Sequence, residues 1–323
     1  MGLSYEFSIG SVRAKEKSLF DNSDIEQMLA CKSESELAGL LSDKGYGDGK
    51  TVDEIIESHT ADVWAYLKSI APDFDIFSPF LIQNDIHNLK VVLKGTMSAR
   101  KYTHLFVEPC TIDTDLIIKA IDNRKFSLLP EWLTKPAEKA YELISHKGDA
   151  RESDAVIDTA AMKRMLEISE QYNSVFLKQY FNTLVFYSNI KTAIRSSRTK
   201  TNKDFLESAL CDVQDFRKSS VINATLKGSE TLIDEISRYS EYECSKAMEQ
   251  YKLSPSSFER FVDDKLIKMA KESCKRISEG AEPIIGYYLG CEAEKKVIHI
   301  IASGIRTNSD SEIIRERLRE IYG

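Results

Sequence analysis

Apolar side chains recur at helical spacing along most of the chain. In one segment Leu37, Leu40 and Leu41 fall on one face, and comparable spacing returns in many later segments. Intervals of three and four residues are typical of an amphipathic α-helix that packs one face against a core. The longest uninterrupted pattern runs from about Asp154 to Ser197, with no internal glycine or proline. The pattern therefore predicts a chain built mainly of helices.

Helix boundaries are marked by hydroxyl side chains and glycines. A hydroxyl followed three residues later by glutamate predicts a capping box, in which both side chains bond free N–H groups of the first turn. Four such patterns begin at Ser23, Ser33, Thr51 and Ser309. Glycines near helix ends are expected at Gly45, Gly95, Gly148 and Gly304. The strand-like segments, Tyr102–Val107 and Val221–Leu226, are short and isolated, so the predicted fold is all-α.

A short helical sequence occurs twice, separated by about one domain's length of chain. Asn88–Lys94 reads N-L-K-V-V-L-K and Asn189–Arg195 reads N-I-K-T-A-I-R, and a weaker third copy begins at Val297. Each copy lies late in a predicted helix. Chance similarity between short amphipathic stretches is the alternative, but the spacing matches the size of a domain. The repeat predicts three related helical domains, which span residues 1–108, 109–214 and 215–323.

Composition narrows the class of protein. The 323 residues are 42% hydrophobic and carry a net charge of −7, and no run of Lys and Arg resembles a nucleic-acid footprint. The apolar stretches Pro283–Ala293 and Val297–Ile305 are each too short to span a bilayer. The first residues lack the apolar segment of a signal peptide. We therefore expect a cytoplasmic protein that does not insert into a membrane and does not bind nucleic acid.

Candidate catalytic chemistry is sparse. The six cysteines form no C-x-x-C pair and the five histidines form no metal-binding spacing, so neither a metal site nor a cofactor is predicted. The segment Gly45–Thr51 ends in G-K-T, as a phosphate-binding loop does. That loop requires a first glycine at position 44, which is Lys44, and a preceding strand, where a helix is predicted. A glycine-rich turn capped by Thr51 is the better interpretation, and no catalytic residue is assigned.

Three segments together resemble a known family. They are Tyr5 with Ser11–Glu16; Asp85–Lys94; and Glu282–Lys295 with Ser303, Gly304 and Ile313–Leu318. Their order and spacing resemble the C subunits of the archaeal and bacterial V/A-type rotary ATPases, which are relatives of the d subunit of eukaryotic V-ATPases. The similarity covers essentially the full length.

The resemblance implies a fold, a function and a set of partners. The fold would be three related helical domains in a pseudo-threefold, funnel-shaped arrangement. The function would be that of a non-catalytic socket, which links the central-shaft subunits of a proton- or sodium-translocating ATPase or ATP synthase to its membrane rotor ring and transmits torque. One copy per complex is expected, as a monomer when isolated, and the chain would be peripheral to the membrane through its partners.

The repeated helix ends supply candidate contacts with those partners. We hypothesise that the late-helix ends of the three repeats form one face, with contact residues Asn88, Lys90, Lys94, Asn189, Lys191, Arg195, Lys295 and Arg306. The third copy departs from the pattern, because Val297 stands where the first two copies have asparagine. The alternative is that the basic residues lie on ordinary solvated helix faces.

Two other functions stay open at this point. A helical adaptor or scaffold of an unrelated assembly would share the helix-rich composition but not the rotor partners. A nucleotide-binding protein would use Gly45–Thr51, and its binding of ATP or GTP would be abolished by Lys50→Ala.

Overall fold

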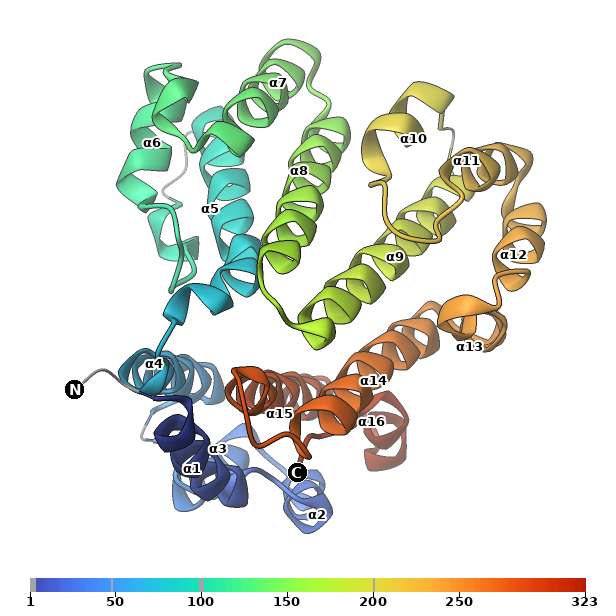
Figure 1. Cartoon of the computed structure of the whole chain (residues 1–323). Helices are drawn as coiled ribbons and strands as arrows, with labels where there is room; N and C mark the ends of the chain where they lie inside the picture. Colours follow the sequence, from blue (N-terminus) through green and yellow to red (C-terminus); the bar gives the residue numbers. More distant parts are fainter. Residues whose placement is uncertain (1–3, 48, 99–101, 200) are drawn as a thin grey trace. The chain divides into compact units, whose positions relative to one another are not determined.

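The computed structural model describes residues 4–47, 49–98, 102–199 and 201–323. Throughout these residues the regular secondary structure is helical and contains no strand, as Figure 1 shows. The predicted all-α class is confirmed. The two strand-like segments contain helix as well: Val221–Leu226 lies within helix α11 (Lys218–Lys227), and Thr103–Leu105 forms a short 3-10 turn.

The chain forms two compact units, which we describe separately. The terminal unit comprises residues 1–76 and 249–323, and the central unit comprises residues 77–248. The terminal unit contains α1 (Tyr5–Lys15), α2 (Asn22–Ala30), α3 (Glu34–Asp43), α4 (Val52–Ile70), α14 (Pro255–Cys274), α15 (Glu282–Arg306) and α16 (Ser311–Arg317). The central unit contains α5 (Ser78–Ser98), α6 (Thr114–Asp122), α7 (Glu131–Lys147), α8 (Ala150–Gln171), α9 (Val175–Ser197), α10 (Lys203–Ala209), α11 and α12 (Ser229–Ser237). Helix α13 (Cys244–Leu253) crosses the boundary. The division into residues 1–108, 109–214 and 215–323 and the funnel-shaped arrangement stay predictions.

Side-chain caps begin most of the helices. Ser33 and Thr51 cap α3 and α4 as predicted, with their hydroxyls accepting from the backbone N–H groups of Glu36 and Glu54 at 3.2 Å each. The prediction was wrong at Ser23 and Ser309. Aspartates cap those helices instead: the Asp21 carboxylate accepts from Asp24 N in α2, and the Asp310 carboxylate accepts from Glu312 N in α16.

The longest predicted helical pattern is two helices. Helix α8 ends at Gln171, and α9 begins at Val175 after a short turn in which the Ser174 hydroxyl accepts from Leu177 N at 3.1 Å. A hydroxyl cap therefore breaks this pattern without glycine or proline. The short connection makes α8 and α9 an antiparallel hairpin, visible in green in Figure 1.

All four glycines predicted near helix ends lie there, two just beyond a helix and two within its last turn. Gly148 ends α7 in a left-handed conformation (φ 64°), and Gly45 follows α3, as predicted. Gly95 and Gly304 lie within α5 and α15. A Cβ at Gly304 would lie 2.4 Å from Ile314 Cδ1, and one at Gly95 would lie 2.0 Å from the Tyr102 ring. Close packing against a later segment, and not helix termination, is the reason for glycine here.

The core of the terminal unit surrounds the second half of α15. Val297, Ile298 and Ile301 have no exposed surface and cluster with Leu37 of α3 and Ile55 of α4. Each such side chain contributes about 1.5–3 kcal/mol by burial. The third copy of the repeated sequence is therefore a core segment.

The core of the central unit is formed around α5, α8 and α9. Leu89 and Val92 of α5, Ile157 of α8 and Ile190 of α9 are all fully buried. One turn earlier on α9, Phe186 stacks on Tyr242 with ring centroids 4.2 Å apart. Both repeated sequences in this unit thus place their apolar residues in the core and leave their Lys and Arg residues toward solvent.

Candidate functional site

The two repeated asparagines make the same contact in the central unit. The Asn88 amide donates to Val107 O at 3.0 Å and accepts from Val107 N at 2.9 Å. The Asn189 amide donates to Cys211 O at 2.7 Å and accepts from Cys211 N at 2.9 Å. Both asparagines are fully buried. Each therefore fastens the segment that follows its helix, and as direct partner contacts they stay a prediction, which their burial does not support.

A carboxylate one helical turn before Asn88 also binds the segment that follows α5. Asp85 of α5 is buried and accepts from the backbone N–H groups of Thr111 at 2.7 Å and Ile112 at 3.0 Å. Burial raises the pKa of Asp85, and the hydrogen bonds from the Thr111 hydroxyl and the two amides oppose that rise. From sequence, Asp85 was named only as the start of the segment Asp85–Lys94 and was given no role in holding the following loop.

The third copy uses this carboxylate position in place of the asparagine. Val297 is buried and apolar, but Glu294, one turn earlier on α15, accepts from Phe20 N and from the Tyr46 hydroxyl, the latter at 2.7 Å. Burial raises the pKa of Glu294 to about 7, against the opposing hydrogen bonds from Phe20 and Tyr46. This residue was missed from sequence, although a charged residue between two apolar stretches was the available signal.

Three of the predicted basic residues lie around one cleft in the central unit. Lys90 of α5 pairs with Asp158 of α8, and Lys191 and Arg195 of α9 line the same cleft. Lys94 lies one turn further along α5 and pairs with Asp154 at 2.8 Å. These four residues of the first two copies therefore lie on neighbouring helices, and two of them already pair with carboxylates of α8.

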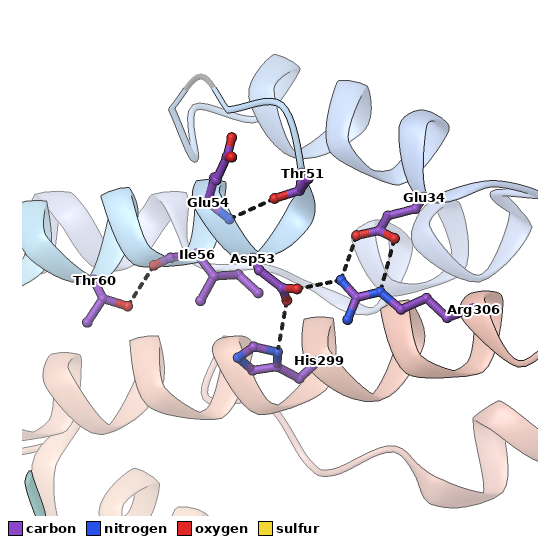
Figure 2. Close-up of polar contacts among 8 residues, drawn as sticks. All are labelled: Glu34, Thr51, Asp53, Glu54, Ile56, Thr60, His299 and Arg306. Carbon is purple, nitrogen blue, oxygen red and sulfur yellow. Dashed lines mark hydrogen bonds and ion pairs between the residues drawn. The ribbon is translucent and has the colours of Figure 1, made fainter. Parts of the chain in front are cut away.

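The basic residues of the third copy lie on α15 in the terminal unit. Lys295 pairs with Glu292 of its own helix at 3.6 Å. Arg306 reaches two carboxylates at the starts of other helices, Glu34 of α3 with Nε at 3.0 Å and Asp53 of α4 with Nη2 at 2.7 Å. Figure 2 shows the arginine between them. The Arg306 side chain thus holds the end of α15 against the first turns of α3 and α4.

The contacts in this network shift the pKa values of its residues. The hydrogen bond from Arg306 lowers the pKa of Glu34, and the two carboxylates raise the pKa of Arg306. His299, also drawn in Figure 2, places Nδ1 3.9 Å from Asp53. Burial lowers the pKa of His299, although Asp53 opposes the change. Because the ion pairs are partly exposed, each contributes at most about 1 kcal/mol.

The glycine-rich segment is a helix-capping turn. It follows α3, and the Lys50 backbone N–H donates to the Glu54 carboxylate at 2.8 Å while Thr51 caps α4. Figure 2 includes the Thr51 contact. The preceding strand that a phosphate-binding loop needs is replaced by a helix. The capped-turn prediction is confirmed for the described residues, with Asp48 lying outside them.

The cysteines are separate thiols. The six cysteines, all among the described residues, form no disulfide, and four of them are buried. Burial raises the pKa of Cys211 to about 11, and burial together with Glu108 raises that of Cys110 to about 12. Thiols with such pKa values are poor nucleophiles at neutral pH.

Within the described residues, no helix combines the length and the apolar character that crossing a bilayer requires.

Comparison with known proteins finds one family along most of the chain. Residues 8–317 match the ATP synthase (C/AC39) subunit family. The C subunit of the V-type sodium ATPase of Enterococcus hirae is 19% identical over 319 residues, which cover 96% of this chain and 97% of that protein. The C subunit of the A-type ATP synthase of Methanocaldococcus jannaschii is 23% identical over 358 residues, covering 97% and 86%. Its counterpart in the A-type ATP synthase of Methanobrevibacter smithii is 23% identical over 337 residues, covering 92% and 83%.

Proposed function

Because this chain belongs to the ATP synthase (C/AC39) subunit family, we propose that it is a non-catalytic central-stalk subunit of a V/A-type proton- or sodium-translocating rotary ATPase. It acts as a socket that links the rotor shaft to the membrane rotor ring and transmits torque between them. The observation that carries this proposal is the extent of the match, since these C subunits of V-type and A-type enzymes align with 92 to 97% of the chain.

The fastened helices support a mechanical role. Asn88, Asn189 and Glu294 each hold a separate segment against a long helix through buried hydrogen bonds. Packed interiors deform little, and buried polar bonds are costly to break. A protein that passes torque between two other parts of a complex needs this resistance to deformation.

The three-domain organisation is part of the same proposal. We propose three related repeats around a pseudo-threefold axis, in a funnel-shaped arrangement, and the similar contacts on α5, α9 and α15 support the relation between the repeats. In the first two repeats the fastened segment follows the helix, whereas Glu294 fastens Phe20, near the other end of the chain. We infer that the N-terminal segment completes the third repeat, which would shift the boundaries from 1–108, 109–214 and 215–323.

The basic residues of the repeats are the proposed contacts with the other subunits. Lys191 and Arg195 are exposed, and Lys90 and Lys295 are partly exposed. Lys94 and Arg306 would have to exchange or share the carboxylates that they now hold. In the complex we expect one copy of this chain, on the cytoplasmic side and peripheral to the membrane, and a monomer when it is isolated.

Tagged purification from membranes in mild detergent tests the proposal. We expect the rotary ATPase shaft and rotor-ring subunits to be recovered with one copy of this chain per complex, and an untagged strain to recover none of them. Recovery of a different assembly would support the helical-adaptor function and contradict the proposal. Recovery of this chain alone would contradict it as well.

A further inference from the structure

A cleft of about 430 Å³ lies in the central unit between α5, α8 and α9. Lys90 and Lys94 of α5 pair with Asp158 and Asp154 of α8, so α5 runs antiparallel to α8. The α8–α9 hairpin is antiparallel too, because Arg151 near the start of α8 donates to Ser196 near the end of α9 at 3.2 Å. Positions along the three helices therefore sort the cleft into two ends.

One end of the cleft is cationic. Lys90, Lys191 and Arg195 line it, and Asp158 is the one carboxylate among the described lining residues. Asp158 is already paired with Lys90. Arg195 is exposed, and within the described part of the chain its guanidinium makes no hydrogen bond or ion pair. This end therefore has an excess of positive charge that suits an acidic partner.

The other end is apolar. Ile86, Met165 and Val185 are buried there, and Met162 and Leu184 are half-buried at the surface of the cleft. Methionine side chains are flexible and polarisable, and they occur often on surfaces that accept helices. An occupant therefore needs apolar side chains at this end and acidic ones about two turns away.

The shape favours a helix over a small molecule. The lining residues span positions 83 to 90 on α5 and 184 to 195 on α9, which correspond to about 10 and 16 Å along the helix axes. That length matches two to three turns of an added helix, at about 5.4 Å per turn. Gln83, His87 and Lys191 are exposed along its edges, so the cleft is an open groove, whereas small-molecule pockets bury most of their ligand.

We propose that this cleft receives an acidic amphipathic helix from another subunit of the rotary ATPase. Its acidic side chains lie against Lys191 and Arg195, and its apolar side chains lie against Met162, Met165 and Leu184. The identity of the partner as a member of that complex rests on the function proposed above. The chemistry of the groove is an observation of this chain alone.

Site-specific photo-cross-linking in the assembled complex tests the inference. Benzoylphenylalanine replaces Ser188, which lines the middle of the cleft, and a second protein carries it in place of Lys139 on the exposed face of α7. We expect position 188 to cross-link to a helical segment of another subunit that has acidic residues next to apolar ones. Position 139 should not cross-link to that segment.

Charge variants identify what holds the helix. Lys191→Glu with Arg195→Glu should lower the cross-link yield from position 188 by about tenfold or more, because like charges then face each other. The matched control, Lys135→Glu with Lys139→Glu on α7, should leave the yield unchanged. Both pairs are exposed, so neither should prevent folding.

The outcomes separate the two proposals. If the complex assembles and position 188 cross-links to lipid, to a basic or irregular segment, or to nothing, the inference is overturned while the proposed function stands. Equal yields from the two charge variants would overturn it too. If the tagged chain recovers no rotary ATPase subunit, the proposed function fails first and takes this inference with it.

Discussion

Glu294 is a carboxyl group in the core of the terminal unit, only 2% exposed. It accepts from Phe20 N and Tyr46 Oη, and the carboxylate of Asp24 adds a repulsion. Tyr46 also stacks on His59, with ring centroids 3.7 Å apart. Burial raises the pKa of Glu294 to about 7 and lowers that of His59 to about 4. Burial therefore shifts the titration of both side chains toward their neutral forms.

The raised pKa of Glu294 predicts a specific pH dependence of stability. Between its unfolded pKa and about 7, the folded chain holds a proton that the unfolded chain has lost, so this residue's contribution to the free energy of unfolding falls as pH rises. The fall is about 3 kcal/mol across roughly pH 4.5 to 7. Glu294→Gln keeps the acceptor oxygen and removes the titration.

Denaturant unfolding of wild type and Glu294→Gln from pH 5 to 8 measures this effect. We expect the difference between the two free energies of unfolding to change with pH, with the wild type losing stability relative to the variant as pH rises. Glu292→Gln, on the partly exposed side of α15, is the matched control. A constant difference for Glu294→Gln would show that the carboxyl is ionised throughout.

At the scale of single elements, helices α5 and α9 each hold the segment that follows them through hydrogen bonds from a buried asparagine. Asn189→Ala removes both partners of the Cys211 peptide groups and leaves a buried N–H and C=O unpaired. Each unpaired group costs about 1–3 kcal/mol. For the two groups together we therefore expect the free energy of unfolding to fall by about 2–6 kcal/mol.

Asn182→Ala provides the comparison on the same helix. Among the described residues its amide donates to Lys178 O alone, one turn away at 2.8 Å, and its loss should cost less than about 1 kcal/mol. Denaturant titrations of both variants check the prediction. Equal costs would mean that Asn189 does not hold the segment around Cys211.

The sequence pattern predicted the presence of helices better than it predicted where they end. The all-helical class, the Ser33 and Thr51 caps and the capped turn before α4 were predictable, because each depends on residues close together in the chain. The break between α8 and α9 was missed, since one serine cap ends a pattern whose apolar spacing continues on both sides. Gly95 and Gly304 do lie near helix ends, but the reason for glycine there is contact with Tyr102 and Ile314, which helical spacing does not show.

The candidate site was also predictable from the sequence only in part. The repeated sequences lie on the helices α5, α9 and α15, and three of their basic residues line one cleft. The roles of the asparagines depended on Val107 and Cys211, about twenty residues later and in irregular segments. The carboxylates that hold Lys94 and Arg306 come from other helices, so sequence alone left those side chains as candidate surface contacts.

At the scale of the whole molecule, the proposed function is that of a non-catalytic subunit that connects other subunits. The family match spans nearly the whole chain, and the buried thiols and capped turn have structural explanations. In a rotary ATPase, loss of the connection between shaft and ring should separate ATP hydrolysis from ion transport. ATP is hydrolysed in the headpiece of such a complex, which does not need the connection, whereas ion transport needs torque to reach the rotor ring.

ATP-driven ion uptake into membrane vesicles, measured alongside ATP hydrolysis with and without this chain, tests that claim most directly. Vesicles that lack the chain should lose ion uptake while their headpieces, bound or released, still hydrolyse ATP. Adding back the purified chain should restore uptake. Uptake that continues unchanged without the chain would contradict the account.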